Sequence, residues 1–226
     1  MKIQSHNTVT NDEQALRSEQ PDEKTLTWSE FLDEVTEIEK ASIVLNDGWT
    51  IQGKVSEPAN PGSIYLRKVT SLSLEGCVSA SCVDFEENLL EQEDVAERRS
   101  EDIRDVATLE YHLLYSLSYQ VPIIYFNAWR PNGTLLGIEE IWALACPTQR
   151  EALNEARWGA ISQQDHPILG TPYYFFHPCN SAQLIANIAR DDRANKVIAW
   201  LSVVAPLVGL ELSIEYIKSI ENLRLT

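Results

Sequence analysis

The stretch TLEYHLLYSLSYQVPIIYFNAW, residues 108–129, decides the fold. Two segments rich in Leu, Ile, Tyr, Phe and Trp, Thr108–Leu117 and Ile123–Trp129, are interrupted by the four residues 119–122. Aromatic and β-branched residues favour strands, whereas Pro122 lacks the N–H that a sheet ladder needs. The stretch therefore predicts two neighbouring antiparallel strands joined by a turn.

Further elements are expected before this strand pair. Residues 27–30, Thr-Trp-Ser-Glu, fit a capping box, and the apolar stripe that follows predicts an amphipathic helix over about residues 28–42. The alternation in Ser63–Thr70 predicts a strand that forms a hairpin with Gly48–Val55.

After the strand pair, Thr134–Ala145 is expected to continue the sheet and Gln163–Pro172 to form a loop. Apolar residues at helical spacing then predict three C-terminal helices, at Leu184–Arg190, Asn195–Leu207 and Glu211–Asn222. Helix, antiparallel strands and then helices is the order of an α+β domain, with one antiparallel sheet and helices on one face and at the end.

The candidate chemistry lies between the last strand and these helices, in Tyr173-Tyr174-Phe175-Phe176-His177-Pro178-Cys179-Asn180-Ser181. The four aromatic residues predict a strand that Pro178 ends. Asn180 and Ser181 are good N-caps, so Cys179 is expected just before a helix N-terminus, where negative charge on its sulfur is favoured. Cys179 is thus either a reactive thiol or a small buried apolar residue, and the local sequence leaves both readings open.

Charge limits the partners and the organisation of the chain. The protein has 226 residues and a net charge of −16, so nucleic acids and anionic membranes are poor partners and a basic protein is a better one. Residues 1–24 are predicted to be a flexible tail, and 25–226 one domain with a mobile acidic insertion at about 75–106. Residues 84–105 within it carry ten acidic and three basic side chains.

The other cysteines and histidines give no second site. Cys77 and Cys82 stand four residues apart, but no second Cys/His pair has matching spacing, so we expect no zinc site and no cofactor. Cys146 is expected to be structural, and His6 and His112 to have no chemical role. With neither a secretory signal nor a membrane span expected, we predict a cytoplasmic protein with reduced thiols.

Residues 115–123, a strand that ends at Trp129, and Phe176-His177-Pro178-Cys179 together resemble the autophagy ubiquitin-like-conjugating enzymes. The short length is similar to the shorter of this family's two branches. The resemblance covers about one third of the chain. It implies a ubiquitin-conjugating-enzyme-like antiparallel sheet with an N-terminal helix and shortened C-terminal helices.

The resemblance also implies an activity. Cys179 would accept a ubiquitin-like protein, autophagy-related protein twelve, as a thioester from the activating enzyme, autophagy-related protein seven. It would pass that protein to a lysine of the acceptor, autophagy-related protein five. By position, Tyr119 and His177 match residues that surround the cysteine in this family and assist transfer. From the residues themselves, an aromatic wall of Tyr119, Tyr173 and Tyr174 is expected to disfavour charge on the lysine, although core packing is the alternative for Tyr173 and Tyr174.

One departure is that ordinary ubiquitin-conjugating enzymes carry His-Pro-Asn before the cysteine, whereas the nearest match here, His166-Pro167-Ile168, is expected to be only a turn. Stabilisation of the oxyanion is therefore assigned to His177 or to backbone N–H groups near Cys179. Two alternatives stay open, a non-catalytic protein-binding module and a cysteine hydrolase with His177 or His166 as base. Against the hydrolase, a histidine two residues from the cysteine across a proline is expected to be poorly placed to contact it.

Overall fold

The computed structural model of the protein describes residues 26–53, 63–73, 106–144, 161–188 and 194–225. Six strands form one antiparallel sheet in the order β1-β2-β3-β4-β6-β5. The strands are β1 (Thr50–Gly53), β2 (Ile64–Ser73), β3 (Val106–Ser116), β4 (Val121–Trp129), β5 (Ile161–Asp165) and β6 (Pro172–Phe176). The helices are α2 (Trp28–Leu45), α4 (Ile138–Leu144), α6 (Cys179–Ile188), α7 (Lys196–Val204), the 3₁₀ helix η2 (Ala205–Val208) and α8 (Glu215–Leu225). The predicted α+β class is confirmed.

The hairpin of β3 and β4 lies at the centre of the sheet, and its two strands pair with each other as their sequence predicts. Its register pairs Tyr111 with Phe126 and Ser116 with Val121, which leaves residues 117–120 as the turn. Pro122 lies inside β4 opposite Tyr115 rather than in the turn. Almost every residue of β4 is buried, by the helices on one face and by side chains of neighbouring strands on the other, at Leu114, Tyr173 and Phe175, and its sequence is accordingly apolar without alternation.

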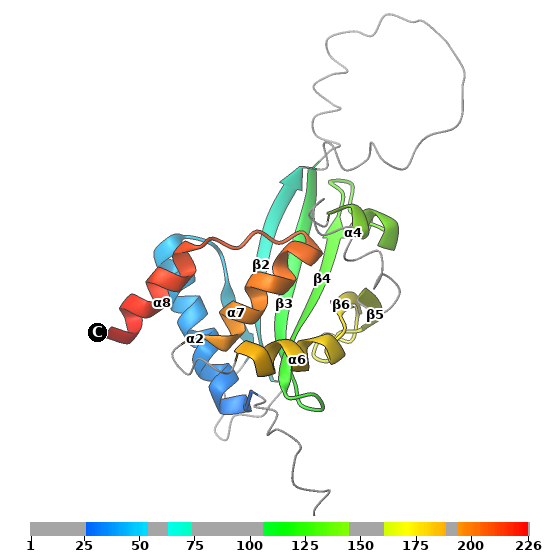
Figure 1. Ribbon diagram of the computed structural model, residues 1–226. Coiled ribbons are helices and arrows are strands. Elements are labelled where there is room, and N and C mark those ends of the chain that lie inside the picture. The colour runs from blue at the N-terminus through cyan, green and yellow to red at the C-terminus, as the bar shows by residue number, and fades with distance from the viewer. Residues whose placement is uncertain (1–25, 54–62, 74–105, 145–160, 189–193, 226) are drawn as a thin grey trace, which may run out of the picture.

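Helices α2, α6 and α7 cover one face of the sheet, and α8 packs beside α2 (Figure 1). The capping box that starts α2 is present, since Thr27 Oγ1 accepts from the Glu30 N–H at 3.2 Å and Glu30 accepts from the Thr27 N–H at 2.7 Å. The predicted apolar stripe of α2 is buried against the sheet, at Phe31, Val35 and Ile38. Helix α2 ends at Leu45, and its C-cap Asn46 adopts the left-handed conformation with φ of 53°.

Polar contacts hold α7 against α2. The Val197 N–H donates to Glu34 Oε2 at 2.8 Å, and Asn195 caps α7 by accepting from the Ile198 N–H while it donates to the Glu34 carbonyl. These bonds satisfy N–H groups that the start of a buried helix would otherwise leave without partners. Burial of the Glu34 carboxyl raises its pKa, whereas the backbone hydrogen bonds lower it. Burial has the larger effect, and the pKa of Glu34 is raised to about 7.

The second face of the sheet carries a smaller apolar cluster and a chain of buried polar groups. The cluster consists of Leu114, Ile123, Tyr125, Tyr173 and Phe175. Beside it, the Ile168 and Leu169 N–H groups donate to His166 Nδ1, so His166 donates through Nε2 to His112 Nδ1, 3.1 Å away. His112 Nε2 in turn donates to Glu110 at 3.1 Å.

Two predicted elements are wrong. Residues 138–144 form α4 rather than a continuation of the sheet, and only Leu135 makes an isolated bridge, to Trp129. A short apolar run fits the period of a helix as well as that of a buried strand. The first part of the predicted loop 163–172 belongs to β5, which looks polar because it is an edge strand with exposed side chains.

The other predicted boundaries are close to the observed ones. The hairpin of β1 and β2 and all three C-terminal helices are present, with α6 longer than predicted and α8 displaced towards the C-terminus. The predicted tail 1–24 lies outside the described residues, and so does the predicted insertion at about 75–106, except for Val106, which begins β3.

The His166–His112 chain predicts a loss of stability as pH falls. Burial lowers the pKa of His166 from 6.5 in the unfolded chain to about 4, so between these values the unfolded chain binds a proton that the folded protein does not. The free energy of unfolding should therefore fall from about pH 6.5 to about pH 4 by on the order of 3 kcal/mol for this group. Urea unfolding monitored by tryptophan fluorescence at stepped pH measures it.

His166→Asn is the matched control, because its Oδ1 can accept the same two backbone N–H groups but does not titrate. Its unfolding free energy should change much less than that of the wild type over this window. Parallel curves for the two proteins would show that His166 is not the responsible group.

Candidate active site

Cys179 is exposed and is the first residue of α6. Strand β6 ends at Phe176, the chain turns through His177 and Pro178, and the Ser181 N–H donates to the Pro178 carbonyl at 3.0 Å. No acidic residue occupies the first turn of α6, so nothing in that turn offsets the positive end of the helix dipole. The position favours negative charge that develops on the sulfur or on an oxyanion beside it.

His177 contacts the thiol directly. Its Nδ1 lies 2.8 Å from Cys179 Sγ and accepts the Cys179 backbone N–H at 3.2 Å. The expectation that a histidine two residues away across a proline is poorly placed to contact the cysteine is wrong, because the tight turn at Pro178 folds the imidazole back over the start of α6. With Nδ1 accepting the backbone N–H, the thiol is the donor towards the same nitrogen. His177 is therefore placed to take the thiol proton, and it also caps α6.

Tyr119 lies in the β3–β4 turn, and its ring meets the His177 ring edge-on at a centroid separation of 6.2 Å. The turn is fixed, because the Leu26 N–H donates to the Gln120 carbonyl and the Tyr115 hydroxyl donates to the Leu26 carbonyl. Tyr119 remains 44% exposed, and in the described parts of the chain its hydroxyl makes no hydrogen bond. It is free to meet a group that arrives at Cys179.

The sheet topology brings these three residues together. Strand β6 runs antiparallel to β4, with Tyr125 opposite Phe175 and Phe126 opposite Tyr174. The C-terminal end of β6 therefore lies beside the start of β4 and the turn that precedes it, although about 60 residues separate them in the sequence. Figure 1 shows α6 passing close to this hairpin end of the sheet.

Of the residues expected in an aromatic wall, Tyr173 and Tyr174 pack in the core, the alternative stated for them. Tyr174 donates to the Leu136 carbonyl at 3.3 Å and packs in the helix-side core, and Tyr173 packs against His112 and His166 on the second face. The aromatic neighbour of His177 on β6 is Phe175, at a centroid separation of 5.9 Å. The alternation of a strand places residues two apart on the same face, so spacing alone could have indicated Phe175.

The predicted N-caps of α6 are also wrong, because Asn180 and Ser181 lie inside the helix. Ser181 is fully buried, and its hydroxyl has no hydrogen-bond partner among the described residues. Helix α6 is instead capped by His177 and anchored to the core through buried Ile185.

The remaining candidates lie away from Cys179 or outside the described residues. His166-Pro167 begins a turn, as predicted, with the Gly170 N–H donating to the His166 carbonyl at 2.8 Å. His112 is buried in the hydrogen-bond chain on the second face. His6, Cys77, Cys82 and Cys146 lie in parts that the structure does not describe. Within the described ranges no group of three His, Cys, Asp or Glu side chains could hold a metal, and no helix is long and apolar enough to cross a bilayer.

Residues 3–215 match the sequence profile of a family described as autophagocytosis associated protein, active-site domain. The chain belongs to this family. The match includes Tyr119, His177 and Cys179, and the family resemblance predicted from the sequence is confirmed.

Curated relatives of this active-site-domain chain carry the name ubiquitin-like-conjugating enzyme ATG10, in agreement with the shorter branch expected from the sequence. The human protein is 38% identical over 120 residues, 51% of this chain and 54% of its own length. The Arabidopsis thaliana protein is 29% identical over 114 residues, 47% and 51% of the two chains. The alignments thus span about half the length of these relatives. A solved structure titled "Crystal structure of Autophagic E2, Atg10" is 14% identical, with a TM-score of 0.39, over 82% of this chain and 95% of that chain.

Substitution of Ser181 by alanine tests the observed helix start. An N-cap serine would lose about 1 kcal/mol of stability on this change. Because the buried Ser181 hydroxyl has no partner among the described residues, we expect Ser181→Ala to be neutral or up to about 1 kcal/mol more stable. Thr27→Ala, at the observed N-cap of α2, should lose about 1 kcal/mol in the same urea titration. A loss at Ser181 equal to that at Thr27 would contradict this helix start.

Proposed function

We propose that this chain is a ubiquitin-like-conjugating enzyme that acts through a thioester on Cys179 in autophagosome formation. Autophagy-related protein seven would deliver autophagy-related protein twelve to Cys179, which would transfer it to a lysine of autophagy-related protein five. The observation that carries the proposal is an exposed thiol at the start of α6, 2.8 Å from a histidine, in a family described by its active site. The names of the relatives support the reaction class.

The first step exchanges one thioester for another. Cys179 loses its proton, with His177 Nδ1 as the nearest acceptor, and the thiolate attacks the C-terminal acyl carbon of the ubiquitin-like protein on the activating enzyme. The carbonyl opens to a tetrahedral oxyanion and re-forms as the cysteine of the activating enzyme leaves as a thiolate. The positive end of α6 stabilises both negatively charged species.

The second step makes an isopeptide bond. A neutral lysine amine of the acceptor attacks the thioester carbon. The amine gives one proton to His177 Nδ1, which has by then returned the thiol proton to water, and the Cys179 thiolate leaves. Tyr119 can donate one hydrogen bond from its exposed hydroxyl to the oxyanion or the entering amine. The partly exposed aromatic surface around His177 lowers the local polarity, which disfavours the charged form of an approaching amine.

The cysteine-hydrolase alternative is favoured by one observation, the His177–Cys179 contact. A hydrolase also needs a group that orients the histidine, and among the described residues no carboxylate or side-chain amide makes a hydrogen bond with His177. A non-catalytic binding module has no need for an exposed thiol with a histidine against it. The conjugating reaction uses the observed pair without a third group, and a reduced thiol fits a cytoplasmic location.

Loading of Cys179 is the direct test. Incubation with the activating enzyme, ATP and autophagy-related protein twelve should give a conjugate that reductant cleaves, seen on a non-reducing gel. Cys179→Ser should give an oxyester that reductant does not cleave, because an oxygen ester resists thiols. A reducible conjugate that persists in Cys179→Ser would place the acceptor at another cysteine. Release of the free ubiquitin-like protein with no acceptor present would favour the hydrolase.

Discharge of the loaded enzyme separates Tyr119 from His177. Tyr119→Phe should load normally and transfer to lysine slowly, by about 100- to 1000-fold if its hydroxyl is an oxyanion donor. His177→Asn retains an acceptor for the Cys179 N–H but cannot take a thiol proton at neutral pH. It should slow both loading and discharge, as His177→Ala should.

Tyr174→Phe is the matched control for Tyr119→Phe, since it removes a buried hydroxyl away from Cys179 and should leave discharge unchanged. Single-turnover discharge with circular dichroism of each variant makes the comparison. Wild-type rates for His177→Asn would leave His177 only its capping role, and wild-type discharge by Tyr119→Phe would remove Tyr119 from the mechanism.

A further inference from the structure

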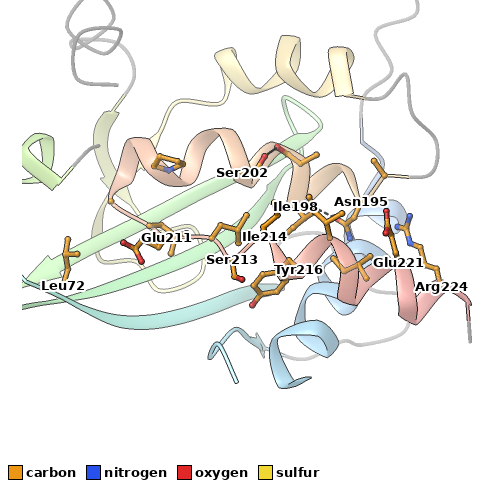
Figure 2. A pocket seen from close by; sticks show the side chains of 18 residues that line it. Leu72, Asn195, Ile198, Ser202, Glu211, Ser213, Ile214, Tyr216, Glu221 and Arg224 are labelled. Atoms are coloured by element: carbon orange, nitrogen blue, oxygen red, sulfur yellow. Dashed lines mark hydrogen bonds between the residues drawn. The ribbon is translucent and has the colours of Figure 1, made fainter. Parts of the chain in front are cut away.

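Helices α7 and α8 border an apolar groove with a cavity volume of about 1040 Å³ (Figure 2). Its floor is made by side chains that are 2–5% exposed, Ile198, Leu210 and Ile220. Its edge carries Ile214 and Ile217, which are 72% and 50% exposed. Large apolar side chains exposed this far beside a concave apolar surface are typical of an interaction site.

The charged side chains that line the groove leave it negative. Glu211 and Glu221 line it, are exposed, and make no ion pair among the described residues. The cation that lines it, Arg224, is bound by the Glu37 carboxylate through Nε at 2.8 Å and Nη2 at 2.7 Å. The groove therefore presents an apolar floor between carboxylates and favours basic residues at the edges of whatever binds it.

We infer that this groove binds an amphipathic helix of a partner protein, with apolar residues on one face and lysine or arginine beside them. Helix α8 has 11 residues, so the groove matches a helix of about three turns with apolar residues at positions i, i+3 or i+4, and i+7. Small lining residues, Ala199, Ser202 and Gly209, permit close approach of a helix backbone.

The charge of this protein argues against two other occupants. A second copy brings another net charge of −16, so two copies repel each other. The segment 84–105 of the same chain, with ten acidic and three basic residues, repels Glu211 and Glu221 in the same way. A basic helix has the complementary sign. The surface is distinct from Cys179, which begins α6, so this inference does not depend on the thioester reaction.

A pair of designed peptides of about 18 residues tests the inference, one with a leucine face flanked by lysines and one with the same face flanked by glutamates. Fluorescence anisotropy of each labelled peptide is measured against the full-length protein at low and high salt. The basic peptide should bind at least tenfold more tightly than the acidic one, with a difference that shrinks as salt rises. Equal affinity of the two peptides, or no binding, would overturn the inference.

Variants locate the binding. Ser202→Trp fills the groove and should abolish binding, and Glu211→Lys with Glu221→Lys should weaken it about tenfold. Leu169→Trp and the double reversal Glu139→Lys with Asp165→Lys add a tryptophan and reverse two charges at exposed positions in the β5–β6 turn, α4 and β5. These elements lie away from α8 in Figure 1, so both controls should bind as the wild type does. Loss of binding in these controls, or wild-type binding by Ser202→Trp, would place the peptide elsewhere. Circular dichroism checks the fold of each variant.

Two further results would identify another occupant and reject the proposal. Sedimentation that finds a dimer dispersed by Ser202→Trp would assign the groove to a second copy. Peptide binding that appears only after removal of residues 74–105 would assign it to that segment. All of these experiments measure peptide binding or molecular mass, and none measures thioester loading. A negative result here therefore leaves the proposal for Cys179 intact.

Discussion

The antiparallel pairing of β6 with β4 is the constraint on which the site depends. Only two residue pairs form it, Tyr125 with Phe175 and Phe126 with Tyr174, and each pair also brings its rings together, at centroid separations of 5.7 and 6.1 Å. The Asn127 side chain adds a hydrogen bond to the Pro172 carbonyl. Because the two strands are antiparallel, the end of β6 lies beside the start of β4 and beside the turn that contains Tyr119.

The two faces of the sheet support this arrangement by different means. On the helix side, burial of large apolar side chains holds α2, α7 and η2 to the sheet, and Glu34 and Asn195 join α2 to α7 by hydrogen bonds. On the second face, the chain from His166 through His112 to Glu110 fastens the β5–β6 turn across β3. The β5–β6 turn is thus bonded to β3, and β6 is paired with β4. Together these contacts hold β6 in register.

The local surroundings of Cys179 differ from the charge of the whole chain. The protein carries 34 acidic and 18 basic residues, yet the first turn of α6 has no carboxylate. The positive end of the helix dipole can therefore stabilise a thiolate or an oxyanion there, with no carboxylate in that turn to oppose it. At the α7–α8 groove, by contrast, the exposed carboxylates of Glu211 and Glu221 favour partners of opposite charge.

Sequence alone determined the elements whose signals are local. The capping box at Thr27 and Glu30 needs only spacing within one turn of a helix, and the β3–β4 pair needs only two apolar segments joined by a short turn. The placement of Cys179 between a strand and a helix needed only a strand-ending proline and the helical pattern after it. Tertiary structure decided the rest, because the deciding partner lies far along the chain or depends on side-chain direction. The apolar run 138–144 became a helix, and the polar residues 161–165 found an edge of the sheet. His177 turned back onto the thiol, while Tyr173 and Tyr174 entered opposite cores. Periodicity states which residues share a face, but only packing states what that face meets.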